Sequence, residues 1–140
     1  MAKKKARKVN LAQVIITLGH PRQPEQHEID VAVILARHYK TAVEFLIPVD
    51  DYKRKTADIV MHGVQWEIKS PIGDSKSTIG NQFSVAKKQS RNIIIDTRRT
   101  AIEFEKIEKK AIIEVKKRPN TKKVILIDKF EKVVEISKHM

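Results

Sequence analysis

Residues 57–69 constrain the fold of this chain more than any other segment, because they have the pattern of two strands joined by a tight turn at His62–Gly63. Side chains two apart in a strand point the same way, so Glu67 and Lys69 lie on one face of the second strand. Asp58, in the first strand, adds a second carboxylate. Because an unpaired charge is costly to bury in a core, these residues favour a site that holds a divalent cation and a charged substrate.

The rest of the chain alternates between helical and extended patterns. Apolar residues three and four apart predict a largely buried helix over residues 25–39. The expected elements are a short apolar element at 11–18, strands at 42–48, 92–96, 123–128 and 132–136, and helices at 25–39, 78–91 and 100–118. This order predicts an α/β fold with a mixed central sheet flanked by helices.

The length of 140 residues suits a single domain. We expect residues 11–140 to form that domain, after a basic flexible arm at residues 1–10. The chain has no cysteine, which excludes a disulfide framework and a thiolate zinc site. It has no apolar run long enough for a membrane-spanning helix, so we expect no membrane partner. Nothing in the sequence indicates an oligomeric state.

The charge of the chain points to its partner. There are 29 Lys and Arg against 17 Asp and Glu, which gives a formal net charge of +12. Such a surface attracts phosphate polyanions through Coulomb steering and counterion release, so nucleic acid is the expected partner. Two alternatives stay open, since lysine also keeps a basic protein soluble and gives weak binding to any polyanion. The arm at residues 1–10 would contact backbone phosphate or would simply be solvated.

Asp58, Glu67 and Lys69 resemble the Asp…Glu-x-Lys signature of the PD-(D/E)xK nuclease superfamily. The wider segment from Thr56 to Asp96 resembles more specifically the C-terminal nuclease domains of contact-dependent growth inhibition toxins, a group that includes tRNases. The resemblance as a whole covers roughly residues 25–96, about half of the chain. The matching pieces are Ala57-Asp58, Trp66 to Pro71, Ser75 to Thr78, Asn81-Gln82, Lys88-Gln89 and Ile93 to Asp96. One departure is Thr56, which stands at the position of the signature's proline.

The resemblance implies a restriction-endonuclease-like core, α-β-β-β-α-β, with an added C-terminal helix and β-hairpin. Asp58 and Glu67 would ligate Mg²⁺ or Mn²⁺, with Zn²⁺ less favoured, because hard cations prefer carboxylates and waters. The resemblance adds the carbonyl of Ile68 as a metal ligand and Glu28, on the first helix, as a further catalytic acid. Lys69 would orient or deprotonate the attacking water, or stabilise the charge of the phosphorane.

The proposed metal site and the catalytic role of Glu28 each have a simpler alternative. The acids and the lysine on adjacent strands could form no more than a surface salt bridge, which would stabilise the fold only slightly. Glu28 lies near the start of a helix, where a negative charge is favourable without any catalytic role.

Further polar residues are candidates for contacts with nucleic acid. A hydroxyl-rich loop that opens a helix suits phosphate, and glutamine or basic side chains on that helix would contact a base edge or the backbone. The candidates are Ser70, Ser77, Thr78, Gln82, Lys87, Lys88, Gln89 and Arg91, with Arg98 and Arg99 as further phosphate ligands. Helix capping and exposure to solvent would account for the same residues without a ligand.

These features favour a metal-dependent nuclease. RNA, with tRNA as one case, is preferred over DNA only through the toxin resemblance. The alternatives are a DNA endonuclease of restriction or junction-resolving type and a non-catalytic, basic nucleic-acid-binding module. A toxin domain would act in the cytoplasm after delivery as part of a secreted protein, and it would have a cognate acidic immunity protein.

Overall fold

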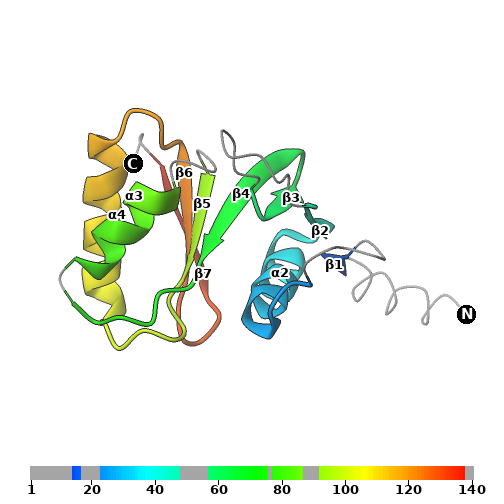
Figure 1. The fold of residues 1–140 in the computed structure, drawn as a ribbon, viewed down its shortest axis with the longest axis horizontal. Coiled ribbons are helices and arrows are strands. Elements are labelled where there is room, and N and C mark those ends of the chain that lie inside the picture. Colours follow the sequence, from blue (N-terminus) through cyan, green and yellow to red (C-terminus); the bar gives the residue numbers. More distant parts are fainter. Residues whose placement is uncertain (1–13, 17–22, 48–56, 76, 87–91, 138–140) are drawn as a thin grey trace, which may run out of the picture.

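The computed structural model describes residues 14–16, 23–47, 57–75, 77–86 and 92–137. Within them lie seven strands and three helices (Figure 1). In chain order these are β1 (Val14–Ile15), α2 (Gln26–Tyr39), β2 (Val43–Phe45), β3 (Ile59–Met61), β4 (Val64–Lys69), α3 (Thr78–Ala86), β5 (Asn92–Asp96), α4 (Phe104–Lys117), β6 (Lys123–Ile127) and β7 (Val133–Ser137). The expected arm at residues 1–10 lies outside the described residues, as do Lys87, Lys88, Gln89 and Arg91.

The strands form one mixed sheet in the order β1 to β7, so that neighbours in sequence are neighbours in the sheet. The β1–β2, β4–β5 and β5–β6 pairs are parallel, and the β2–β3, β3–β4 and β6–β7 pairs are antiparallel. Each parallel pair is joined by a connection that contains a helix, as parallel pairing requires. The predicted α/β class with a mixed sheet is confirmed.

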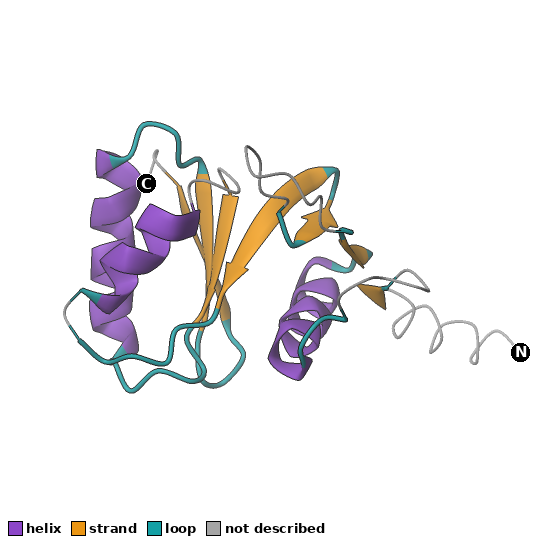
Figure 2. Ribbon diagram, in the orientation of Figure 1, coloured by secondary structure: helices purple, strands orange, loops and turns teal. Residues whose placement is uncertain are grey.

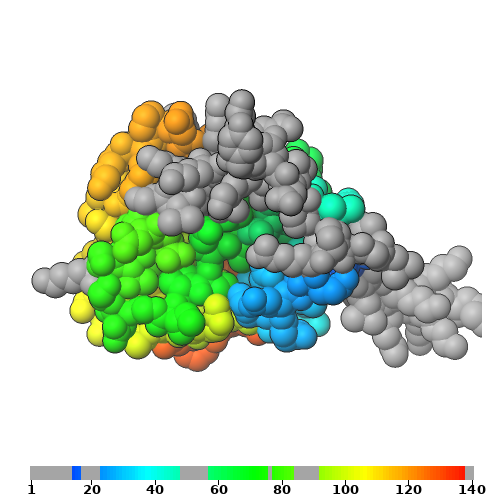
Figure 3. All heavy atoms as spheres, viewed as in Figure 1, coloured from blue at the N-terminus to red at the C-terminus, as the bar shows by residue number. Residues whose placement is uncertain are grey.

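The sheet is covered by helices on both faces, with α2 on one side and α3 and α4 on the other (Figure 2). The buried strand β5 belongs to both cores, because Ile94 packs in the apolar cluster of α2 whereas Ile93 and Ile95 pack in the cluster of α3 and α4. This explains its continuous apolar run. In the space-filling view, residues of α2, in blue, and of the segment that includes α3, in green, are visible on the same face as yellow and orange residues of α4 (Figure 3).

The β3–β4 hairpin closes through a two-residue loop, since Met61 pairs with Val64. His62 and Gly63 in this loop both have positive φ, 53° and 72°, which is the combination that a type I′ turn needs. The loop fixes the register of β4. A slip by one residue would move Trp66 out of the α2 core and turn its neighbours over.

Some predicted boundaries are corrected by the structure. The helix predicted over residues 100–118 spans only Phe104–Lys117. Thr100 holds the preceding segment out of the helix, because its hydroxyl donates to the carbonyl of Gly73 at 2.6 Å and accepts from the N–H of Ile102 at 3.3 Å. The strand predicted over residues 42–48 contracts to Val43–Phe45, and the helix predicted over residues 78–91 is described only to Ala86.

Candidate active site

Strand β4 places Glu67 and Lys69 on the face opposite Trp66 and Ile68, which pack against the core of α2. The Nζ atom of Lys69 lies 2.9 Å from Oε2 of Glu67. Glu67 is only 1% exposed, whereas the side chain of Lys69 keeps 19% of its surface. Ile93, the β5 neighbour of Glu67, is buried under α3 and α4. The carboxyl group of Glu67 is therefore buried beside apolar residues and contacts a partly exposed cation.

Asp58 is fixed beside this pair by three hydrogen bonds. Its Oδ2 atom accepts from the N–H of Ile68 at 2.7 Å. Its own N–H donates to the carbonyl of Trp66 at 3.0 Å, and its carbonyl accepts from the N–H of Leu46 at 2.9 Å. Asp58 is thus held between β2 and β4. The structure brings the two predicted acids and the lysine together.

The surroundings of Glu67 raise its pKa from 4.5 to about 9. Burial is the largest cause, hydrogen bonding to Asp58 and repulsion from that carboxylate add to it, and Lys69 opposes it. The Oε1 atom of Glu67 is buried and has no hydrogen-bond partner among the described residues. A divalent cation would supply both the missing partner and the missing charge, and it would displace the proton. The donor set therefore fits a hard divalent cation.

Two carboxylates are a suitable number for magnesium. Within the described ranges, no three His, Cys, Asp or Glu residues group in a way that could hold a metal ion. Mg²⁺, however, keeps several waters and is commonly bound by one or two carboxylates together with a substrate phosphate. Asp58 and Glu67 meet that requirement, and the carbonyl of Ile68 lies in the same strand.

Glu28 has a different setting from the other predicted acids. It lies in the first turn of α2, where its Oε1 atom accepts from the N–H of Glu25 at 2.8 Å. The two residues form a capping box, which stabilises the start of the helix. The structure does not bring Glu28 into a three-acid cluster with Asp58 and Glu67.

The predicted phosphate-binding hydroxyls lie in two places. Ser70 follows β4 and points to the end of β5. Ser77 and Thr78 lie at the start of α3, where the Thr78 hydroxyl accepts from the N–H of Ser75 at 3.1 Å and the Ser75 and Ser77 hydroxyls are 3.2 Å apart. Gln82 lies half-buried on α3. The hydroxyls of Ser77 and Thr78 organise the start of α3, and the hydroxyl of Ser70 bonds to Asp96. Contact of these groups with phosphate stays a prediction.

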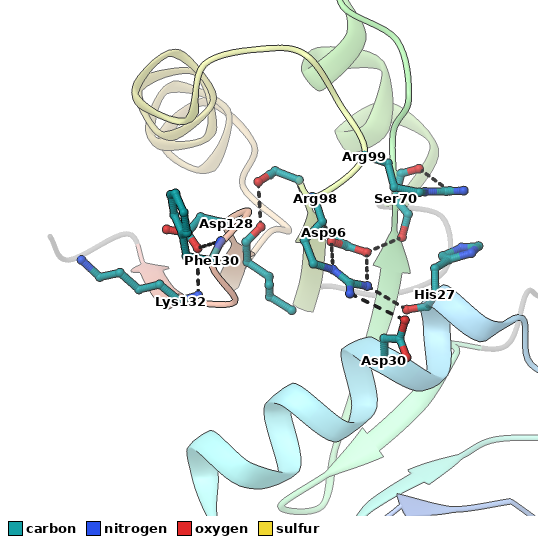
Figure 4. A network of polar contacts seen from close by, with 11 residues as sticks. His27, Asp30, Ser70, Asp96, Arg98, Arg99, Asp128, Phe130 and Lys132 are labelled. Carbon is teal, nitrogen blue, oxygen red and sulfur yellow. Dashed lines mark hydrogen bonds and ion pairs between the residues drawn. The ribbon is translucent and has the colours of Figure 1, made fainter.

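Arg98 belongs to a partly buried network that the sequence patterns did not predict (Figure 4). Its Nε and Nη2 atoms donate to Oδ1 and Oδ2 of Asp96 at 2.8 and 2.9 Å, and Nη2 also donates to the carbonyl of His27 at 3.1 Å. Asp30 lies 3.7 Å from Nη1, and the Ser70 hydroxyl donates to Asp96 at 3.3 Å. Asp96 is fully buried. Arg98 therefore ties α2 to the end of β5, and its contact with phosphate stays a prediction.

A second buried acid, also missed, organises the basic end of α4. Glu114 is 1% exposed and pairs with Arg118 at 2.7 Å and with Lys110 and Lys117 at 3.3 Å each. Burial works against the charged form, but the bonds from these three cations hold the pKa of Glu114 below its usual value. Three cations around one carboxylate leave this helix end with a net positive charge.

Together, the mixed sheet and the paired acids with their lysine define an α/β domain with a candidate metal-binding centre. The family model of the contact-dependent growth inhibition CdiA C-terminal domain matches residues 55–133, and the chain belongs to that family. The matched segment contains the hairpin, both acids, Lys69 and the Asp96–Arg98 pair.

A solved structure shares the fold. The CdiA-CT/CdiI toxin and immunity complex from Burkholderia pseudomallei contains a chain that is 20% identical, with a TM-score of 0.58. The match covers 87% of the present chain and 98% of the other. No curated protein matches the sequence. Among the described residues, no helix has the length and apolar character to span a membrane.

Proposed function

We propose that this domain is a metal-dependent nuclease of the PD-(D/E)xK type, which hydrolyses phosphodiester bonds. The setting of Glu67 carries this proposal: a buried carboxylate next to a second acid, with one oxygen on Lys69 and the other without a partner among the described residues. Such an arrangement does not serve the stability of the fold, because replacing buried charged groups by apolar ones is often neutral or stabilising. Buried acids with strongly shifted pKa values are instead typical of sites that bind ligands or catalyse reactions.

Asp58, Glu67 and the carbonyl of Ile68 would hold Mg²⁺ or Mn²⁺. When bound, such an ion polarises the scissile phosphate and lowers the pKa of an attacking water. Lys69 is fixed at 2.9 Å from Glu67 and remains partly exposed, so its ammonium is placed to orient that water or to stabilise negative charge on the phosphorane. Asp58 would keep its position throughout, since Ile68 and Trp66 hold it.

RNA is the proposed substrate, with tRNA as the first RNA to test. The formal charge of +12 supports a polyanionic substrate, and the cations around Glu114 belong to that basic surface. The preference for RNA over DNA rests on the likeness to toxin domains that include tRNases.

An acidic immunity protein is the proposed protein partner. The similar Burkholderia pseudomallei chain was solved as a complex of toxin and immunity protein. A strongly basic domain would attract an acidic partner at a high rate. In this proposal the domain is delivered as part of a secreted toxin and acts in the cytoplasm of the target cell, while the immunity protein protects the producer.

The function is tested by incubating the protein with tRNA, plasmid DNA and single-stranded DNA in Mg²⁺, Mn²⁺, Zn²⁺ or chelator. The expected result is cleavage of tRNA with Mg²⁺ or Mn²⁺ and none with chelator. Cleavage of plasmid alone would make the domain a DNA endonuclease. Binding without cleavage under every metal condition would make it a non-catalytic binding module.

A further inference from the structure

Arg99 lies beside the strand end that carries Lys69, and its side chain is exposed. Its Nη2 atom donates to the carbonyl of Ser70 at 2.9 Å, and Ser70 directly follows Lys69 at the end of β4. In Figure 4, the Arg99 side chain extends past Ser70 and away from Arg98. The bond to Ser70 therefore holds an exposed guanidinium at the edge of the proposed active centre.

The segment that carries Arg99 is fixed on both sides. The hydroxyl and the N–H of Thr97 both donate to the carbonyl of Ile127, at 2.7 and 2.9 Å. The Thr100 hydroxyl donates to the carbonyl of Gly73 at 2.6 Å, so Arg99 and Thr100 both bond to the loop that follows β4. A side chain mounted on such a segment needs little ordering when it meets a ligand.

The charge of Arg99 differs in its setting from the charges of the two cations next to it. Lys69 is paired with Glu67 at 2.9 Å. Arg98 is paired with Asp96 at 2.8 Å. Within the described ranges, no ion pair includes Arg99, and a guanidinium has more N–H donors than its single bond to a carbonyl uses. Arg99 therefore offers a positive charge and directed donors to an anionic substrate.

We infer that Arg99 binds the backbone phosphate of the nucleotide adjacent to the scissile bond of the RNA. The inference rests on the proposed nuclease function. Ser70 is one residue beyond Lys69, so a phosphate bound there neighbours the one on which Lys69 acts. A guanidinium suits this role, because its fork of N–H groups fits two phosphate oxygens. Arg99 anchors the substrate and Lys69 acts on the reacting phosphate, so the effects of the two cations are separable.

Binding of tRNA in chelator tests the contact without cleavage. Arg99→Gln should weaken binding at least about fivefold and make the log–log salt slope shallower by about 1, because each phosphate contact releases about one counterion. Arg99→Lys keeps the charge without the fork, so it should restore the slope and only part of the affinity. The matched control is Arg37→Gln, at an exposed position in the last turn of α2, which should bind like the wild type.

Single-turnover cleavage of tRNA with Mg²⁺ separates the two cations. Arg99→Gln should raise the protein concentration that gives the half-maximal rate at least about fivefold, with a maximal rate within about threefold of the wild type. Lys69→Met should do the reverse. A wild-type protein that binds tRNA and does not cleave it would contradict the nuclease proposal, and the binding comparison in chelator would still decide whether Arg99 contacts phosphate.

The position of the phosphate is tested with an RNA oligonucleotide that contains the mapped cleavage site. A neutral methylphosphonate next to the cleaved bond should weaken wild-type binding at least about threefold and should not weaken Arg99→Gln further. The inference is overturned if this modification weakens both proteins equally, or if Arg99→Gln binds tRNA like the wild type. It is also overturned if Arg37→Gln weakens binding as much as Arg99→Gln, or if Arg99→Gln lowers the maximal rate instead of the affinity.

Discussion

The ammonium of Lys69 lies 2.9 Å from Oε2 of Glu67, yet the pKa of that carboxyl still stands at about 9. The lysine therefore does not make up for burial and for the nearby Asp58. Without a bound cation, the folded protein holds Glu67 protonated at neutral pH. The centre is arranged for a ligand of greater positive charge than one ammonium, which is the physical basis of the proposed metal site.

The stability of the metal-free protein should fall as the pH rises toward 9. Between about pH 5 and about pH 9, Glu67 stays protonated in the folded state and is ionised in the unfolded state, so the folded state binds more protons and loses stability as pH increases. Urea unfolding in chelator, at about pH 5, 7 and 9, measures this. The free energy of unfolding of Glu67→Gln should change less with pH than that of the wild type. Near pH 9 it should exceed the wild-type value by at least about 1 kcal/mol.

The control for that comparison is Glu105→Gln, an exposed acid in the first turn of α4. It should follow the wild-type pH dependence. If Glu67→Gln follows the wild type as well, then Glu67 is not buried next to Asp58 as described.

Lys69→Met should slow the chemical step and leave substrate affinity nearly unchanged. The lysine is placed to act on charge that develops in the transition state, so its loss should lower kcat by about 100-fold or more with binding changed by less than about threefold. Single-turnover cleavage and binding to a non-cleaving competitor separate the two. A large rise in KM at unchanged kcat would instead make Lys69 a phosphate anchor.

Replacing either of the adjacent arginines Arg98 and Arg99 by alanine should have very different effects on stability. Arg98→Ala removes the cation that pairs with the fully buried Asp96, so it should destabilise the fold by about 3 kcal/mol or more. Arg99 is exposed and donates to the carbonyl of Ser70 at 2.9 Å, so Arg99→Ala should cost less than about 1 kcal/mol. Urea midpoints give both values, and equal midpoints for the two variants would contradict the role of Arg98.

Binding to nucleic acid should weaken steeply with salt. Measured on the Asp58→Ala protein, which should not cut, the log–log slope is expected at about −4 or steeper, because each phosphate contact releases about one counterion. Deleting residues 2–8 should make the slope shallower if the basic arm contacts phosphate. A flat salt response would mean that the charge of +12 serves another partner.

The elements and the central hairpin follow from local patterns. The two-residue period of 57–69 and the His62–Gly63 turn determine which side chains share a face, so Glu67 and Lys69 could be paired from sequence. The start of α4 could not be predicted, because Thr100 is held by the carbonyl of Gly73, 27 residues earlier. The spacing of apolar residues within a helix does not indicate such a distant contact.

Contacts between distant parts of the chain also explain why the network of Arg98 could not be predicted from sequence. Arg98 stands in a basic stretch that favours phosphate binding, and only the fold brings the carbonyl of His27 and the carboxylate of Asp30 to it. The aspartate two residues earlier, at the end of a buried strand, was the available local signal.

Cleavage of tRNA by the wild type and by three single variants tests the central claim most directly. Asp58→Asn and Glu67→Gln keep the shape of each acid and remove its charge, and Glu105→Gln serves as the matched surface control. With Mg²⁺ present and folding verified by circular dichroism, the account predicts wild-type cleavage by Glu105→Gln and a loss of at least about 100-fold for the other two. Wild-type rates in folded Asp58→Asn and Glu67→Gln would contradict it.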